Sequence, residues 1–178
     1  MSEEYPTVYH IGPHPYTLTD LFVMPFQSQF LTNTGLPRVS DFHFKSGTTL
    51  RMRLDGSLET LPEAEILTDE IIKGLFYPIL SRDNIDQLES DHPQDVDCSY
   101  QIEGYDYNFR INLFHQRNGL AAVIRLLPEK ILSIDEVGFP NEIIRNNVIH
   151  HKQGCFIFSG VTGSGKSTTI AAIVQHLL

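Results

Sequence analysis

Residues 160–167 read GVTGSGKS and fit the pattern G-x-x-x-x-G-K-[ST] at every fixed position. Glycines permit backbone angles that other residues resist, and they let main-chain amides approach an anion closely. A helix that follows such a loop directs the positive end of its dipole at the same point. The pattern is therefore typical of a loop that grips phosphate groups, and it requires a buried strand before it and a helix after it.

The residues on both sides of this loop match that requirement. Residues 155–159, CFIFS, form a short apolar run of the kind found in buried parallel strands. Residues 166–178 carry Ile170, Ile173, Val174 and Leu177 at helical spacing. The alternative, a chance glycine-rich turn, is disfavoured because it does not account for the flanking strand and helix.

The motif assigns candidate roles to individual residues. Lys166 is expected to reach the β- and γ-phosphates, and the Ser167 hydroxyl is expected to bind Mg²⁺. Thr168 can add a hydroxyl near the α-phosphate. The predicted cofactors are ATP and Mg²⁺, and the predicted nucleotide-binding residues are Gly160, Thr162, Gly163, Ser164, Gly165, Lys166, Ser167 and Thr168.

Hydrolysis needs more than this loop, because an acidic residue must position Mg²⁺ and another group must orient the attacking water. The catalytic residues are expected beyond Leu178. The sequence therefore predicts an N-terminal fragment that does not hydrolyse ATP at a useful rate on its own.

Upstream of the loop, alternating strands and helices predict an α/β protein. Alternating apolar residues and the Asp55-Gly56 turn indicate a hairpin after Val39. Thr68 is suited to cap a helix, and a second helix is expected from Asp83. Strands are expected at 97–103, 107–116 and 120–127, and the last of these is expected to be central in its sheet. Residues 1–38 show weak periodicity and are predicted to be a tail or loop with a short helix at Thr17–Met24 that Pro25 ends.

Composition excludes several classes of protein. A net charge of −9 argues against a nucleic-acid binder, and the absence of an apolar run near 18 residues argues against membrane insertion. The acidic start lacks the pattern of a secretory signal, so Cys98 and Cys155 are expected to be reduced thiols. No metal site is expected from the histidines. His43 and Asp41 share a strand face, and a structural hydrogen bond is the preferred interpretation.

Several upstream segments, in order, resemble those of the PilT-like ATPases of type IV pili and of type II and IV secretion. They are Val39 to Phe44 (VSDFHF), Leu50 to Gly56 (LRMRLDG), Tyr107 to Arg117 (YNFRINLFHQR) and Leu120 to Pro128 (LAAVIRLLP). Together with the loop, the resemblance covers about residues 39–178.

This resemblance implies a PAS-like α+β N-terminal domain at 39–128, a linker at 129–140 and the truncated start of a RecA-like motor domain at 141–178. It also implies a homo-hexamer that works at the cytoplasmic side of the inner membrane against a platform protein. Arginines of the N-terminal domain contact nucleotide in this family, and Arg110, Arg117 and Arg125 stand in the matching segments. A solvated strand face or a salt bridge is the alternative for each arginine.

Two other functional hypotheses stay open at this point. The chain can be a non-enzymatic interaction domain with an inert loop, or a small P-loop kinase. The kinase is disfavoured because its loop would stand near the start of its domain. The sequence does not distinguish pilus retraction, which drives twitching motility, from pilus extension or another export task.

Overall fold

The computed structural model describes residues 8–33, 35–138, 142–150, 153–160 and 165–178. The chain divides into two compact units, Met1–Leu127 and Pro128–Leu178. Helices and strands are mixed, which confirms the predicted α/β class. Over the described residues, no helix combines the length and the apolar character that crossing a membrane requires.

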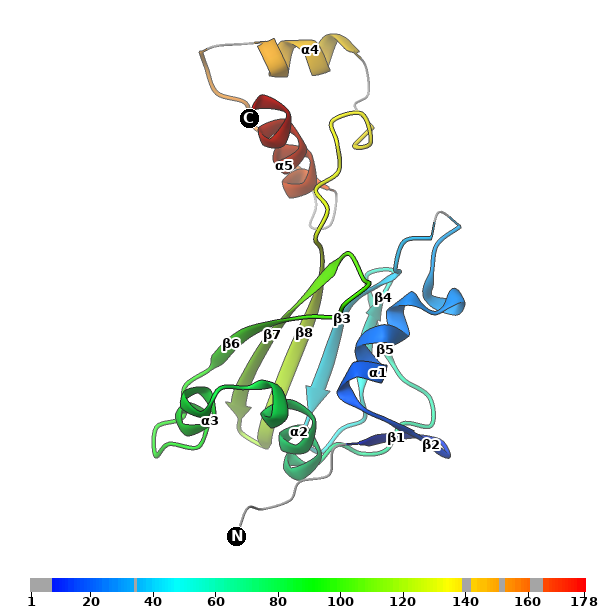
Figure 1. Ribbon diagram of the computed structural model, residues 1–178, viewed down its shortest axis with the longest axis vertical. Helices are drawn as coiled ribbons and strands as arrows, with labels where there is room; N and C mark the ends of the chain where they lie inside the picture. Colours follow the sequence, from blue (N-terminus) through cyan, green and yellow to red (C-terminus); the bar gives the residue numbers. More distant parts are fainter. Residues whose placement is uncertain (1–7, 34, 139–141, 151–152, 161–164) are drawn as a thin grey trace. The chain divides into compact units, whose positions relative to one another are not determined.

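Within the described residues, the first unit is built on a six-stranded sheet with the order β5-β4-β3-β8-β7-β6 (Figure 1). Antiparallel pairing joins β3 to β4 and to β8, β4 to β5, and β6 to β7. The central place of β8 confirms the prediction made from its apolar sequence. The strands are β3 (Val39–Lys45), β4 (Arg51–Leu54), β5 (Ser57–Thr60), β6 (Val96–Gln101), β7 (Tyr107–Gln116) and β8 (Gly119–Pro128).

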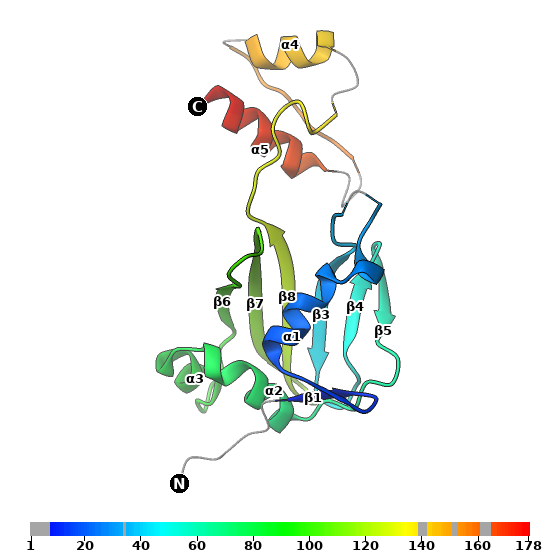
Figure 2. The same cartoon turned by 45° about the vertical axis from the view of Figure 1, so that its right-hand side comes forward.

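Helices α1 (Leu18–Val23), α2 (Asp69–Phe76) and α3 (Arg82–Leu88) lie over one face of this sheet (Figures 1 and 2). Each begins after a hydroxyl side chain that accepts a hydrogen bond from a first-turn amide, and the caps are Thr17, Thr68 and Ser81. A 3₁₀ turn that contains a proline follows each of α1 and α2, and these turns span Met24–Phe26 and Tyr77–Ile79. A further 3₁₀ turn spans Ser28–Phe30. The helices expected at Thr17, Thr68 and Asp83 are thereby confirmed.

The core fills the space between these helices and the sheet. Phe42 and Phe44 of β3 and Ile111 of β7 are almost fully buried, as period-two alternation predicts for a sheet with one covered face. Phe22 of α1 stacks on Phe109 of β7 with ring centroids 4.5 Å apart. Burial of each such side chain stabilises the unit by roughly 1.5–3 kcal/mol.

Residues 8–33 and 35–38 do not form a loose tail. They contain a hairpin of β1 (Tyr9–Ile11) and β2 (His14–Tyr16), followed by α1. Leu18, Leu21 and Phe22 of α1 are core residues. The predicted loop or tail is therefore replaced, over these described residues, by elements of the first unit.

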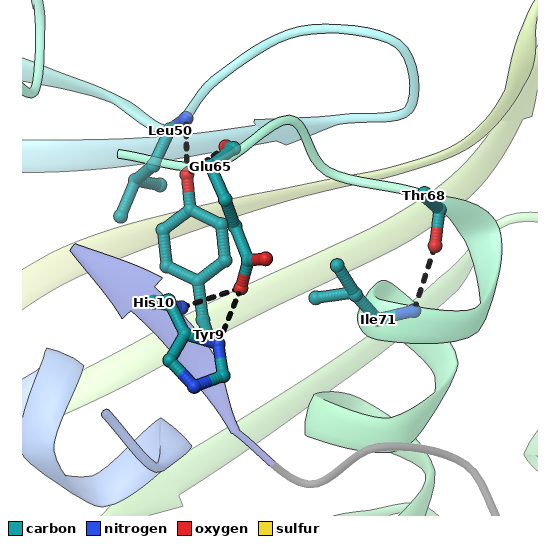
Figure 3. A network of polar contacts seen from close by, with 6 residues as sticks. All are labelled: Tyr9, His10, Leu50, Glu65, Thr68 and Ile71. Carbon is teal, nitrogen blue, oxygen red and sulfur yellow. Dashed lines mark hydrogen bonds and ion pairs between the residues drawn. The ribbon is translucent and has the colours of Figure 1, made fainter. Parts of the chain in front are cut away.

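Tyr9 anchors this hairpin (Figure 3). Its hydroxyl donates to the Glu65 carbonyl at 2.6 Å and accepts from the Leu50 amide at 3.0 Å. The Glu65 carboxylate accepts from the His10 amide at 2.5 Å and lies 3.0 Å from His10 Nδ1. These partners are 41 to 56 residues apart in sequence. The periodicity of residues 1–38 therefore could not predict that the hairpin docks there.

The second unit contains α4 (Glu142–His150) and α5 (Lys166–Leu177). Proline suits the first turn of a helix, but Pro140, which precedes α4 in the sequence, lies outside the described residues. The strand predicted at Cys155–Ser159 is wrong, because the described residues there have no strand structure and Ile157 is 87% exposed. A parallel strand exists only through pairing with its neighbours, and the described part of this unit contains no strand to pair with.

Candidate nucleotide-binding site

Helix α5 follows the loop directly, as the motif requires, although the described residues before the loop form no strand. Helix α5 begins at Lys166, directly after Gly165, which has φ 83° and ψ 9°. This left-handed conformation is strained for residues with a Cβ atom, although a Cβ built there meets no neighbour. The glycine is therefore demanded by the turn itself. Thr162, Gly163 and Ser164 lie outside the described residues, and their roles stay predictions.

The first turn of α5 differs from those of α1, α2 and α3. Gly165 has no side chain to accept from the first amides, whereas the other three helices have a hydroxyl cap. Amides in the first turn of a helix lack intrahelical acceptors. An anion can take that place, and the helix dipole favours it.

Lys166 and the two hydroxyl residues after it stand at this end of the helix. The Lys166 ammonium donates to the carbonyl of Gly160 at 2.9 Å, so its side chain turns back toward the first residue of the motif. Ser167 and Thr168 are exposed. The structure thus gathers a positive charge and two accessible hydroxyls at the start of α5.

Thr169 has a different role, which the sequence reasoning did not assign. Its amide and its hydroxyl both donate to the Gly165 carbonyl, at 2.9 and 3.0 Å. The hydroxyl is therefore used within the helix and shares the Gly165 carbonyl with the Thr169 amide. The tendency of threonine to bond the carbonyl four residues earlier is the signal that predicts this arrangement.

The three candidate arginines all belong to the first unit. Arg110 of β7 and Arg125 of β8 project from the sheet face opposite the core, because Ile111 and Ile124 beside them are buried. Arg110 pairs with Asp97 at 3.6 Å. Arg117 is exposed and lies in the turn between the two strands, outside both of them. A nucleotide role for the three remains a prediction.

Arg125 has a buried partner in Asp41, which is 5% exposed. Its Nε donates to Asp41 Oδ1 at 2.9 Å, and Ser40 Oγ donates to Oδ2 at 2.7 Å. Arg53 Nε lies 3.3 Å from Oδ2. Burial alone raises the pKa of Asp41, but these bonds and the charges of both arginines outweigh it, so the pKa is lowered and the carboxylate is ionised.

His43 shares the face of Asp41, as expected, but the predicted hydrogen bond between the two is wrong. Among the described residues, the bonds of Asp41 go to Ser40 and Arg125, with Arg53 in an ion pair. His43 Nε2 is buried without a partner in the same set of residues. Burial lowers the pKa of His43, and nearby arginines reinforce the shift while Asp41 opposes it, so the neutral form is favoured at pH 7.

The described residues of the loop fit the phosphates of a nucleotide. Three features supply donors and positive charge: a left-handed glycine, a first turn that has no side-chain cap among the described residues, and a lysine at its start. Ser167 provides the hydroxyl oxygen that Mg²⁺ accepts as a ligand in loops of this pattern.

Comparison with known proteins decides the family. The sequence model of the family described as Type II/IV secretion system protein matches residues 19–178. The chain belongs to this family. The resemblance seen in the sequence motifs is thereby confirmed, and the α/β fold agrees with it.

Individual members of the family are similar over most of the chain. The type IV pilus retraction ATPase PilT of Pseudomonas aeruginosa is 33% identical over 154 residues, which is 84% of this chain and 42% of PilT. The type IV pilus assembly ATPase PilB of Thermus thermophilus is 30% identical over 179 residues, which is 93% of this chain and 19% of PilB. A crystal structure of the pilus retraction motor PilT with bound ADP is 33% identical and has a TM-score of 0.59, covering 78% of this chain and 39% of that one. This chain thus spans less than half the length of these relatives.

Proposed function

We propose that this chain binds ATP and Mg²⁺ through Gly160–Thr168 and forms part of an ATP-driven motor of type IV pilus or secretion systems. The observation that carries the proposal is the junction at Gly165, where a left-handed glycine without a side-chain cap leads into a helix that opens with Lys166 and Ser167. Support comes from the family, whose matched members include pilus retraction and assembly ATPases.

Each described residue has a physical role in this proposal. Lys166 offsets the charge of the β- and γ-phosphates, and Ser167 is a ligand of Mg²⁺. Thr168 donates near the α-phosphate. Mg²⁺ held there would offset the negative charge of the phosphates. Arg110, Arg117 and Arg125 are proposed as further phosphate contacts, because arginine is always charged and binds phosphate in a fork.

The proposal extends to assembly and location. It includes a homo-hexamer. It also includes an N-terminal domain at 39–128, a linker at 129–140 and a motor domain from 141. The boundary between the two compact units, at Leu127/Pro128, supports the end proposed for the N-terminal domain. It also includes a site at the cytoplasmic side of the inner membrane and a platform protein as partner. The names of the relatives cover both pilus retraction and pilus assembly, so the direction of motion stays undecided.

A titration with a fluorescent MgATP analogue tests the proposal. Lys166→Ala removes a charged donor to phosphate, so we expect an affinity about 10- to 100-fold weaker. Lys130→Ala is the matched control, because it removes a lysine of the same unit that is 72% exposed and pairs with Glu136 at 3.8 Å. Equal affinities for the original chain and Lys166→Ala would refute the assigned role of the loop.

A second candidate function is an interaction domain with an inert loop. Exposed apolar side chains in the second unit, including Phe156 at 46% and Ile157 at 87%, favour it because a protein partner can bury them. The same titration separates the two candidates. An inert loop predicts no saturable binding of the analogue by the original chain.

A further inference from the structure

A hollow of about 140 Å³ lies on the face of the six-stranded sheet that helices α1, α2 and α3 do not cover (Figures 1 and 2). His43 of β3, Arg51 of β4 and Val123 of β8 line it and are cross-strand partners. Their neighbours Phe42 and Ile124 are buried in the core, so these three side chains point to the opposite face. The hollow is therefore a feature of the first unit alone.

Apolar side chains form much of the wall of this hollow. They are Leu58, Phe114, Ala121 and Val123, which come from four different strands or strand ends. Leu58 is 45% exposed and adds apolar surface at the rim. A space of about 150 Å³ holds a group the size of a benzene ring. The hollow can thus accept one apolar side chain, and it is too small for an extended ligand.

Two cationic side chains, Lys45 and Arg51, also line the hollow, and its described lining includes no acidic residue. Neither cation has an ion pair among the described residues, whereas Arg53 and Arg125 on the same face both pair with Asp41. The chain has 22 acidic and 13 basic residues, so acidic partners are abundant elsewhere. The positive charge at the hollow is therefore available to an external carboxylate.

We propose that the hollow is a docking site for an acidic segment of a partner protein. The segment inserts one apolar side chain against Phe114 and Val123 and places carboxylates beside Lys45 and Arg51. Charge complementarity and apolar walls together favour this occupant. A nucleic-acid strand is disfavoured, because it requires basic side chains along several phosphates rather than two at one hollow. The inference goes beyond the proposed function and does not depend on nucleotide.

A peptide titration followed by ¹⁵N NMR of the full chain tests the docking site. The probe is a pentapeptide with leucine at the centre of four glutamates, and we expect saturable shifts of the His43, Arg51 and Val123 amide signals. A peptide with glycine at the centre should bind at least about fivefold more weakly, because it lacks the side chain that the hollow buries. Shifts confined to other residues, or equal affinities for the two peptides, overturn the proposal.

Charge variants test the role of the two cations. Lys45→Gln and Arg51→Gln should each weaken binding of the leucine peptide by roughly 2- to 5-fold, as expected for exposed charge pairs. Arg82→Gln is the matched control, because it removes the same charge from α3, where the side chain is 82% exposed. Its affinity should stay within about 1.5-fold of the original, since solvent and salt screen a distant exposed charge. An equal loss in Arg82→Gln would show a net-charge effect and refute docking at the hollow.

Shape variants test the apolar walls without changing any charge. Val123→Phe fills the hollow, so the affinity for the leucine peptide should fall to that for the glycine peptide. Leu58→Ala shortens an exposed wall residue and should weaken leucine-peptide binding by about 2-fold while leaving the core intact. Urea unfolding checks that each variant is folded. Full leucine-peptide affinity in both folded variants contradicts insertion of an apolar side chain.

Other occupants of the hollow are outcomes of the same experiments. If sedimentation shows that the chain self-associates and that Arg51→Gln abolishes this, a second copy occupies the hollow and the proposal fails. It also fails if a strand of ten thymidines displaces the leucine peptide and binds more tightly. Lys166→Ala should bind the peptide as the original chain does. Failure of the proposed nucleotide site and failure of the docking site are therefore separate results.

Discussion

The two units of the chain bury their apolar side chains to different degrees. In the first unit, large residues of the sheet and helices such as Phe42, Phe76 and Ile111 have essentially no exposed surface. In the second unit, Ala172 and Ile173 of α5 are buried, but Ile157 and Val174 are 87% and 50% exposed. The unit with a complete core carries none of the phosphate-binding motif, and the unit with the motif leaves much of its apolar surface uncovered.

This difference teaches where stability and chemistry reside. An antiparallel sheet with helices on one face closes a core from consecutive segments, because hairpins bring neighbouring strands together. A strand of the P-loop type depends on parallel neighbours that the described residues do not provide. The predictions below test this contrast, and they run from the largest expected effect to the smallest.

The same substitution, Ile→Ala, should lower the free energy of unfolding far more in the first unit than in the second. Ile111→Ala removes a fully buried side chain and should lower the free energy of unfolding by about 2–5 kcal/mol. Ile157→Ala removes a mostly exposed one and should change it by no more than about 0.5 kcal/mol. Urea unfolding measures the change for both variants. Tyrosine fluorescence reports on the first unit, because all tyrosines precede residue 128, and far-UV circular dichroism reports on both units. Similar changes in the free energy of unfolding for the two variants would contradict the difference in burial between the units.

Alkaline pH should destabilise the first unit through Tyr9. Burial raises the pKa of this residue to about 12, with a further increase from the Glu65 charge and a partial decrease from the Leu50 hydrogen bond. The folded state therefore holds the proton more tightly than the unfolded state. This stabilisation is complete below pH 10, where the unfolded tyrosine is still protonated, and it is lost as the pH rises through 12.

The loss amounts to about 2–3 kcal/mol, and urea unfolding between pH 9 and 12 measures it. Tyr9→Phe should show a smaller decrease over this range, and its difference from the original chain should shrink as the pH rises. Tyr16→Phe, in the neighbouring strand β2, keeps Tyr9 and should follow the original chain. Parallel pH profiles for all three proteins would contradict the assigned role of Tyr9.

Two glycines with nearly the same positive φ allow a matched comparison between the units. Gly165 has φ 83° and Gly47, in the turn between β3 and β4, has φ 80°, and a Cβ at either position meets nothing within 4 Å. Each Gly→Ala substitution should therefore cost about 1 kcal/mol through backbone strain. Only Gly165→Ala should weaken binding of the MgATP analogue. A loss of affinity in Gly47→Ala would show that the effect is not specific to the loop.

The smallest expected effect is a difference in thiol reactivity, which uses the one cysteine in each unit. Cys155 is exposed, whereas Cys98 is partly buried and its pKa is raised by burial and by the charge of Asp97. Iodoacetamide at pH 8 should modify Cys155 several-fold faster, because the thiolate is the reactive form. Mass spectrometry of the labelled peptides measures the two rates, and Cys155→Ser should remove the fast phase. Faster labelling of Cys98 would contradict the burial difference.

Local signals predicted much of the first unit. Asp55 and Gly56 have φ values of 49° and 85°, the left-handed pair that their turn sequence predicts. Thr68 caps α2, and β7 has the bounds that alternation predicted. The docking of Tyr9 and the pairing of Asp41 with Arg125 were not predictable, because each contact joins segments that the sequence keeps far apart.

The amino-acid sequence by itself determined the turns, the helix caps, the alternation of the strands and the phosphate-binding motif with the glycine at 165. These features depend on the backbone preferences and side-chain chemistry of a few consecutive residues. Only the tertiary structure decided that residues 8–38 join the first unit, that Asp41 takes Arg125 rather than His43 as its partner, and that Cys155–Ser159 forms no strand. Pairing and burial depend on which distant segments meet, and no local pattern contains that information.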